Sequence, residues 1–338
     1  MPRRRRELRV LLVGAGVSAS CGIAVAKDIL RESLLKLTAT EAGKAHEVHN
    51  LLRYLYPDFD ASYRNYPNIE DFLNLLEMAK AFNSQEFIES SLWSTQRLEE
   101  TNEIILRAVT EYVWEVMNRN QKPRHITEFF TNHVPIGNVV ITFNWDLTVE
   151  EALRQRRDVP QIVYSYKKKE SHKQITLLKP HGSIDWFNKQ DIRAIGIERP
   201  IRLHKDVYTY EPLTFLISRD LFNATPLIIP PVASKQFSNH GIFRRTWISV
   251  YRAVSDATTL TVLGYSLPKE DQFSRFVLRR ALRNNIRRAE QGKKQPLKLI
   301  VVNPDETTET TFARIAGREN VRFHFHRAYF QDFVDSLQ

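Results

Sequence analysis

Five clusters of glycines and polar residues follow apolar runs in this sequence, each at the point where a run ends. Ligands of open parallel sheets bind outside the carboxyl ends of the strands, so side chains in these places are candidates for chemistry. Any one cluster could be ordinary turn chemistry, since Gly, Asn, Asp and Ser favour turns. Five clusters that all follow the ends of apolar runs favour one shared site. They are Gly14 to Ser18, Asn144-Trp145-Asp146, Lys179 to Ser183, Gly264-Tyr265-Ser266 and Asn303.

The first cluster has the spacing of a phosphate-binding turn. The apolar run Val10 to Val13 leads into Gly14 and Gly16, and Ala19 stands where a third small residue is expected. Gly14 would allow a tight turn, and Gly16 would let backbone N–H groups approach a pyrophosphate. A helix from about Ala24 would add partial positive charge. The alternative is a strand–turn–helix corner without a ligand.

The clusters need a sheet to position them, and the apolar patterns predict one. Short apolar runs alternate with helical patterns, which is typical of a parallel sheet covered on both faces. The predicted strands are 10–13, 138–143, 161–166, 175–178, 227–229, 259–263, 298–302 and 321–325. Predicted helices cover 24–37, 147–156, 241–255 and 270–289. The predicted fold class is α/β.

A helical segment interrupts this alternation. From about Thr40 to Asn132 apolar and aromatic residues recur at spacings of three and four. We interpret it as a helical insertion whose aromatic residues form a core. The predicted domains are therefore a sheet domain, residues 1–38 and 133–338, and an insertion, residues 39–132.

Length and composition allow a large core. The chain has 338 residues, of which 42% are hydrophobic and 26% charged. No run approaches the ~20 apolar residues of a membrane span, and no signal peptide is recognisable. We expect a cytoplasmic protein without membrane contact. The single cysteine, Cys21, excludes an internal disulfide and a multi-cysteine zinc site, so no zinc or other metal is expected.

The formal net charge is +10. An anionic partner such as nucleic acid or a nucleotide is one interpretation. The basic residues fall in short runs without the interleaved aromatic residues of single-strand binders, so solvated surface is the better interpretation of each run. Any contact with nucleic acid is expected to be indirect. The runs are Arg3 to Arg6, Lys167 to Lys169, Arg244-Arg245, Arg279-Arg280, Arg287-Arg288 and Lys293-Lys294.

Taken in order, the motifs at the five clusters resemble those of the sirtuin superfamily. They read G-A-G-V-S, T-F-N-W-D, K-P-H-G-S, L-G-Y-S-L-P and V-V-N-P. They are most similar to the bacterial sirtuin-like branch, whose members include antiphage NAD-degrading enzymes. The resemblance covers about Leu8 to Leu30 and Ile136 to Phe325, and not the insertion. It implies a Rossmann-like, sirtuin-like domain that takes NAD as its substrate.

The resemblance also implies a role for each polar residue. Asn144 and Asp146 would hold the nicotinamide ribose and the water near it. His181 would be the base that takes a proton from a ribose hydroxyl or from water. The NAD pyrophosphate and the riboses would be held by Gly14, Ala15, Gly16, Ser18, Gly264, Ser266 and Asn303.

These residue types suit cleavage of the nicotinamide–ribose bond. The reaction forms an oxocarbenium-like ribose, as in glycoside hydrolysis. Nicotinamide is already cationic in NAD, so it leaves without a strong general acid. A fixed ribose, a placed nucleophile and a base are then required, and a histidine suits the last role.

Three departures separate this chain from protein-deacylating sirtuins. The four-cysteine zinc module is missing, since Cys21 is the single cysteine. Gly182 to Trp186 stands where those enzymes carry an F-G-E type segment that helps to bind the acyl-lysine peptide, and Gly22 to Asp28 replaces a G-I-P-D-F-R type sequence. The peptide-binding half therefore differs, whereas the NAD-binding half is retained.

Our first hypothesis is an NAD glycohydrolase, a hydrolase that releases nicotinamide and ADP-ribose, acting as an antiphage abortive-infection effector. A protein deacylase is the second hypothesis, and a catalytically idle NAD-binding subunit of a larger defence complex is the third. A dehydrogenase is disfavoured. Dehydrogenases carry an acidic residue about 20 positions past the glycines, at the end of a second strand, and this sequence has a helical pattern there. Unrestrained NAD hydrolysis would harm the cell, so we expect control by self-association or by a partner protein. The resemblance implies a partner such as a HerA-type ATPase or a short Argonaute protein.

Overall fold

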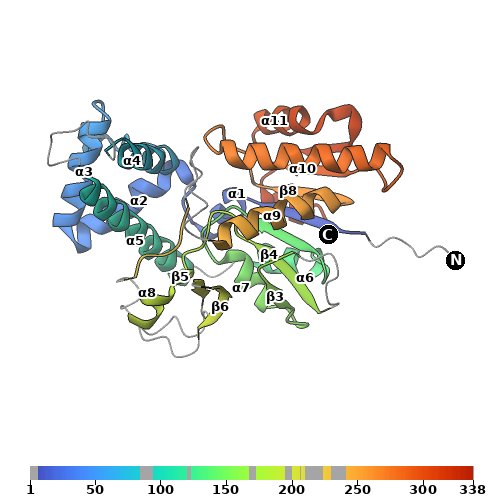
Figure 1. Cartoon of the computed structure of the whole chain (residues 1–338), viewed down its shortest axis with the longest axis horizontal. Helices are drawn as coiled ribbons and strands as arrows, with labels where there is room; N and C mark the ends of the chain where they lie inside the picture. Colours follow the sequence, from blue (N-terminus) through green and yellow to red (C-terminus); the bar gives the residue numbers. More distant parts are fainter. Residues whose placement is uncertain are drawn as a thin grey trace. The chain divides into compact units, whose positions relative to one another are not determined.

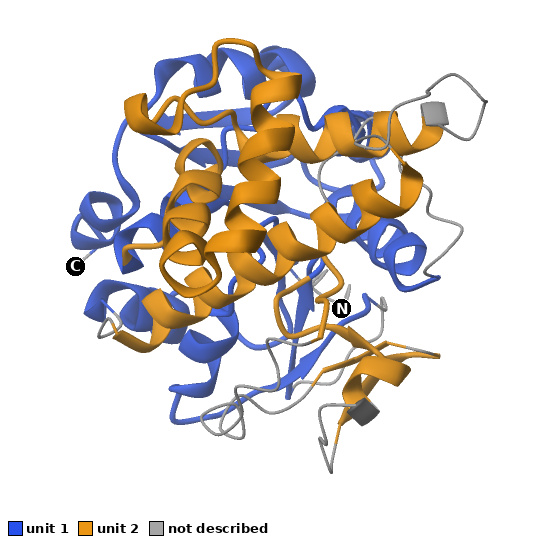
Figure 2. Ribbon diagram, turned by 90° about the vertical axis from the view of Figure 1, so that its left-hand side faces the viewer, with its two compact units in different colours: residues 1–21, 121–182, 236–338 blue, residues 22–120, 183–235 orange. Residues whose placement is uncertain are grey.

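The structure, a computed structural model, describes residues 7–83, 94–119, 123–166, 173–194, 200–205, 207–209, 224–229 and 241–337. The chain divides into two compact units, each built from segments distant in sequence (Figure 2). Unit 1 holds residues 1–21, 121–182 and 236–338, and unit 2 holds residues 22–120 and 183–235. Residues 39–120 of the predicted insertion belong to unit 2, together with residues 22–38 and 183–235. Helix α6 (Arg124–Asn132), which also lies within the predicted insertion, belongs to unit 1.

Unit 1 is organised around a seven-stranded sheet in the order β10-β9-β8-β1-β2-β4-β3 (Figure 1). Every strand pair is parallel, with Val10 opposite Val139 on one side and Leu260 on the other. The central strands are almost entirely buried apolar residues, as expected for strands covered on both faces. The predicted α/β class with a Rossmann-like parallel sheet is confirmed. The strands are β1 (Arg9–Val13), β2 (Val139–Thr142), β3 (Gln161–Val163), β4 (Gln174–Leu178), β8 (Thr259–Leu263), β9 (Lys298–Val302) and β10 (Arg322–His326).

Helices cover both faces of this sheet. On one face lie α9 (Gly241–Asp256), α10 (Gln272–Glu290) and α11 (Glu306–Ala316), whose apolar side chains share one core cluster with alternate residues of the strands. On the other side lie α6 (Arg124–Asn132) and α7 (Thr148–Arg154) (Figure 1). Helix α12 (Phe330–Asp335) packs on α6. The amphipathic helices bury their apolar stripes on the sheet, so the carboxyl ends of the strands are held in fixed register.

The chain reverses its direction of winding between β1 and β8. The connection after β1 leads to β2 on one side, whereas the connection after β8 leads to β9 on the other side. In open α/β sheets the crevice outside the carboxyl ends at such a point is where ligands bind. Gly14 and Gly264, the first residues after these two strands, belong to two of the five clusters singled out in the sequence.

Unit 2 is mainly helical in its first segment. Helix α2 (Ala26–Thr40) packs against α3 (Ala42–Leu55), α4 (Ile69–Asn83) and α5 (Thr95–Arg119). Its second segment forms α8 (Lys189–Ala194) and a small antiparallel sheet of β5 (Phe187–Asn188), β7 (Val207–Thr209) and β6 (Ile201–His204). The sequence did not predict this sheet, because its strands are too short for an alternating pattern to stand out.

Two local predictions were wrong in detail. The predicted strand 227–229 reduces to a single bridge at Ile228, because Pro226 and Pro230 enclose a segment too short to extend a ladder. Leu227 instead donates its backbone N–H to the Trp186 carbonyl oxygen. The predicted strand 161–166 ends at Val163, and the backbone N–H of Tyr166 donates to Ser249 on α9.

No helix in the described part of the chain is long and apolar enough to cross a membrane. The basic runs Arg3 to Arg6 and Lys167 to Lys169 lie outside the described residues.

Candidate active site

The glycine turn after β1 packs directly on the turn after β8. A Cβ atom at Gly14 would lie 2.5 Å from the Cα of Tyr265, and a Cβ at Gly16 would lie 2.9 Å from the Cα of Gly264. Gly264 itself has a φ of 57°, a conformation that favours glycine. The three glycines are therefore required for close contact between two backbone segments.

This packing corrects part of the phosphate-binding interpretation. The N–H of Gly16 donates to the Gly264 carbonyl oxygen at 2.9 Å, so this group is not available to a pyrophosphate. The helix after Gly14 is α1 (Ala15–Ser18), which has only four residues, because a 3₁₀ turn and Gly22 at a φ of 81° redirect the chain before α2. The helix that begins at the turn is therefore shorter than the sequence predicted. Ala15 and Gly16 remain partly or fully exposed at the turn.

Asn144 joins the second cluster to the first. It follows β2, and its side-chain Nδ2 donates to the Gly14 carbonyl oxygen at 3.0 Å and to the Ser18 hydroxyl at 2.7 Å. With both amide hydrogens committed, Oδ1 is the acceptor that Asn144 can offer to a ligand hydroxyl. The structure thus brings together three of the residues that the sequence had singled out.

Asp146 has a structural contact that the sequence did not reveal. It is 5% exposed, and its Oδ1 accepts the backbone N–H of Thr148 at 2.9 Å, which satisfies a free donor at the start of α7. Its carbonyl oxygen accepts from Lys179 Nζ at 2.6 Å. Lys179 also pairs with Glu150 at 2.9 Å, and neither of these two side chains is exposed. This buried ion pair connects the loop that carries His181 to helix α7.

His181 pairs with a carboxylate side chain ninety positions away in the sequence. Its Nε2 lies 2.8 Å from Oδ2 of Asp271, and the two side chains are 4% and 2% exposed. The backbone N–H and hydroxyl of Ser274 donate to the same carboxyl group, as does the Tyr265 hydroxyl at 3.3 Å. Several donors therefore stabilise the ionised form of Asp271 in a buried place.

Aromatic rings enclose this pair and connect it to the other clusters. Phe143, which precedes Asn144, stacks on Tyr265 with ring centroids 4.1 Å apart. The His181 ring lies 5.4 Å from Phe143 and 5.8 Å from Trp247. The loops after β2, β4 and β8 are thus packed on one another around His181. A low-dielectric wall strengthens the electrostatic coupling between His181 and Asp271.

The remaining predicted residues have different surroundings. Ser266 is exposed, and the next residue, Leu267, is buried with a φ of 54°, which is uncommon for a residue other than glycine. Asn303 is 6% exposed and its Oδ1 accepts the N–H of Asp305 at 2.9 Å, so it shapes the turn into α11. No described contact joins Asn303 to Asn144 or His181. Their roles toward a ligand stay predictions.

Sequence reasoning missed Asp271. The spacing Asp271 to Ser274 is a helix N-cap signal, and Asp271 does cap α10 by accepting the Ser274 N–H at 3.1 Å. That signal explains a helix start, and nothing local indicates a histidine partner. Phe143 and Tyr265 lie within motifs that the sequence singled out, but they were given no role there, and Trp247 was not singled out.

Outside these clusters the described residues show one further hollow and no metal-binding group. Among the described residues no group of three or more His, Cys, Asp or Glu side chains could hold a metal ion. Within unit 2, a polar hollow of about 620 Å³ is lined by residues that include Arg107, Asp191 and Thr225. Arg107 donates to the Thr225 hydroxyl at 3.2 Å, and burial raises the pKa of Asp191.

Comparisons with known proteins yielded solved structures alone. No family model matches the chain, and no curated protein matches it. The chain is similar to a structure of Sir2Tm bound to a propionylated peptide, with 14% identity, a TM-score of 0.43 and coverage of 98% of this chain and 91% of that one. It is similar in the same way to a Sir2 complex with a p53 peptide and NAD⁺, at 14% identity, a TM-score of 0.43, and the same coverage of 98% and 91%.

Proposed function

We propose that unit 1 binds NAD and hydrolyses its nicotinamide–ribose bond, releasing nicotinamide and ADP-ribose. The observation that carries the proposal is the buried His181–Asp271 pair, packed through Phe143 and Tyr265 against the loops that follow β1, β2 and β8. A histidine held by a carboxylate beside a topological switch point suits a general base for a bound nucleotide.

Asp271 defines which nitrogen of His181 acts. An ionised carboxylate only accepts hydrogen bonds, so the proton of the neutral imidazole lies on Nε2, which contacts Asp271 at 2.8 Å. Nδ1 is then the basic nitrogen and takes the proton from the attacking water or from a ribose hydroxyl. The positive charge that forms on the ring is stabilised by Asp271 in its buried surroundings.

Asn144 fits the role of a ribose-positioning residue. Its two amide hydrogens are donated to Gly14 and Ser18, which fixes the orientation of the side chain. Its Oδ1 would accept a hydrogen bond from a ribose hydroxyl, as the motif resemblance implies. Fixing the ribose in this way lowers the entropy cost of reaching the oxocarbenium-like transition state. Asp146 would act beside it on the nucleophilic water.

The experiment is chromatography of the products after incubation with NAD, with and without an acetyl-lysine peptide. Nicotinamide and ADP-ribose without peptide support the proposal. Nicotinamide release that requires the peptide would identify a deacylase, and NAD binding without turnover would identify an idle NAD-binding subunit. The missing four-cysteine module favours the first outcome, since the peptide-binding half of the motif set is altered.

Substitutions test the proposed roles of Asn144 and His181. We expect N144A and H181A each to reduce nicotinamide release by about 10²-fold or more, as the loss of a positioned group or a general base does. N284A and H324A are matched controls, because Asn284 is on α10 and His324 is exposed on β10. Wild-type turnover by H181A would remove this residue from the mechanism.

The motif resemblance also supports a biological role. We propose an antiphage effector that depletes NAD in an infected cell, works without zinc and is controlled by self-association or by a partner protein. Infection of cells that carry the wild-type chain or H181A tests this role. Protection that is independent of His181 would contradict it.

A further inference from the structure

Most of the excess positive charge of this chain lies on two neighbouring helices. Helices α9 and α10 together contain nine arginines, no lysine and two carboxylates, which gives them a net charge of +7 out of +10 for the chain. The basic runs looked unremarkable in the sequence, because Arg244-Arg245 on α9 lies more than thirty residues before the runs on α10. Their charge becomes significant only when the two helices are considered together.

The arginines form two exposed stripes on the same side of the sheet. On α9 the exposed arginines are Arg244, Arg245 and Arg252, and on α10 they are Arg279, Arg280, Arg283 and Arg287. Both helices bury their opposite sides in one core cluster with the sheet and pack on each other. Their exposed stripes therefore point away from the same face of the sheet, over a length of about 28 Å for the 19 residues of α10.

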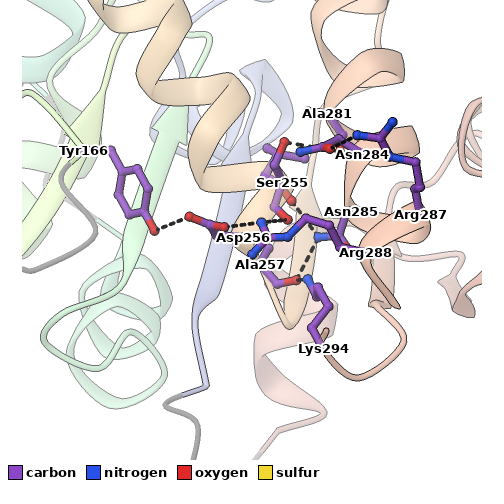
Figure 3. A network of polar contacts seen from close by, with 11 residues as sticks. Tyr166, Ser255, Asp256, Ala257, Ala281, Asn284, Asn285, Arg287, Arg288 and Lys294 are labelled. Atoms are coloured by element: carbon purple, nitrogen blue, oxygen red, sulfur yellow. Dashed lines mark hydrogen bonds and ion pairs between the residues drawn. The ribbon is translucent and has the colours of Figure 1, made fainter. Parts of the chain in front are cut away.

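The two helices are held together at one end by a polar network (Figure 3). Asn285 Nδ2 donates to the carbonyl oxygens of Val254 and Ala257 at 2.7 and 2.8 Å, and Arg288 pairs with Asp256. Lys294 donates to the Ala257 carbonyl oxygen. Cations at the carboxyl end of α9 complement its dipole. The relative position of the two stripes is thus fixed.

Within the part of the chain that the structure describes, no acidic side chain pairs with these exposed arginines. Elsewhere in the described chain, surface cations pair with glutamates one helical turn away, as Arg107 does with Glu103 and Arg124 with Glu128. Among the described residues, none of the seven exposed arginines of α9 and α10 lies within ion-pair distance of a carboxylate. An array of like charges costs stability through self-repulsion, so its presence favours an anionic partner over simple solvation.

The composition of this surface distinguishes a nucleic-acid partner from a protein partner. Protein interfaces have an apolar core from which charged residues are depleted, whereas here only Ile248 and Phe276 are exposed large apolar residues, at 41% and 54%. Arg280 already covers the Phe276 ring, at 5.6 Å from its centroid. Guanidinium groups spaced along two helices suit repeated phosphates, which they bind in bidentate fashion. We propose that the α9/α10 arginine surface binds the phosphate backbone of a nucleic acid.

The test is fluorescence anisotropy with a labelled DNA duplex of about 30 base pairs over a series of salt concentrations. The wild type binds at low salt, and log K falls linearly with log salt. The triple variant R279Q/R283Q/R287Q binds at least about tenfold more weakly and loses about 2.7 from the salt slope, because each phosphate contact contributes about 0.9. Glutamine keeps the helix propensity at these exposed positions.

The matched control is R314Q/R318Q/R322Q, which removes the same charge from exposed positions on or near α11 and β10. We expect it to bind within about twofold of the wild type. Equal weakening by both triple variants, or no binding by the wild type, would overturn the proposal. Displacement of the duplex by polyglutamate as efficiently as by unlabelled duplex would also overturn it, in favour of an acidic protein surface.

Discussion

Asp271 is the residue whose role is most sharply defined by its surroundings. It is 1% exposed, it caps α10, and its second oxygen accepts from Tyr265 and lies 2.8 Å from His181 Nε2. An asparagine would keep the size of the side chain and the cap of α10. It would lose the charge that fixes the proton on Nε2 and stabilises the ring when it becomes a cation.

We therefore expect D271N to lower kcat for nicotinamide release by about 10²- to 10⁴-fold while KM for NAD changes little. D305N is the matched control, because Asp305 caps α11 through the Thr307 N–H at 2.9 Å and is exposed. Steady-state kinetics and thermal unfolding of both variants separate the effect on catalysis from the effect on stability. If D271N kept its kcat and lost only stability, Asp271 would be a helix cap and no more.

The glycine turn permits a second prediction at this scale. Gly14 has an extended backbone that any residue adopts, with φ at −120° and ψ at −176°, so only space limits a substitution. A Cβ there would lie 2.5 Å from the Cα of Tyr265, a backbone atom that cannot move alone. Gly43 near the start of α3 has no atom within 4 Å of the corresponding position.

We expect G14A to lower the free energy of unfolding by about 1–3 kcal/mol, as overpacking does, and to reduce activity as well. G43A should raise it by about 0.5–1 kcal/mol, since alanine is the better helix former. Urea unfolding at neutral pH measures both. Equal stability of G14A and wild type would show that the two turns can separate without cost.

At the scale of elements, the end of α9 is a place where charge and burial compete. Burial, with a smaller contribution from Arg288, lowers the pKa of Lys294 to about 8. The unfolded chain keeps a lysine pKa of about 10.4. Between about pH 8 and pH 10 the unfolded state therefore binds more protons than the folded state, and stability from this group rises with pH.

We expect the free energy of unfolding of the wild type to rise relative to K294M as the pH increases from about 8 to about 10, because methionine cannot titrate. Urea titrations at several pH values in this range measure the difference. K293M, which removes the adjacent exposed lysine, is the control for net charge. A constant difference between wild type and K294M over this range would contradict the prediction.

At the scale of the whole molecule, the proposed reaction raises the question of control. Unrestrained hydrolysis of NAD would harm the cell that makes the enzyme, so contacts with another chain are the proposed control. If the control is self-association, nicotinamide release per molecule should increase at least about tenfold between roughly 10 nM and 10 µM protein, in step with the fraction of oligomer. Full turnover by a dilute monomer without any partner would contradict control by assembly.

The light-scattering mass of each sample, measured beside its activity, separates the two forms of control. If the protein stays monomeric and inactive at every concentration, control by a partner chain is the remaining explanation. The proposed arginine surface of α9 and α10 favours neither form of control. A nucleic acid bound there would make contacts that are separate from those between protein chains.

The sequence by itself determined the strands of the parallel sheet, their order along the chain and the polar clusters that follow them. Such features are local: a short apolar run followed by glycine or asparagine produces a strand end wherever it occurs. The strand 259–263 and the strand 298–302 were predicted with their observed bounds, and α10 begins two residues from its predicted start.

Only the tertiary structure decided which residues meet. His181 and Asp271 are ninety positions apart, and Gly14 packs on a turn 250 residues later. The arginines of α9 and α10 share one surface because both helices cover the same face of the sheet. Contacts of this kind follow from strand order and from the side on which each crossover passes. No local pattern of residue types encodes them, because the physical forces that select them act between segments and not within them.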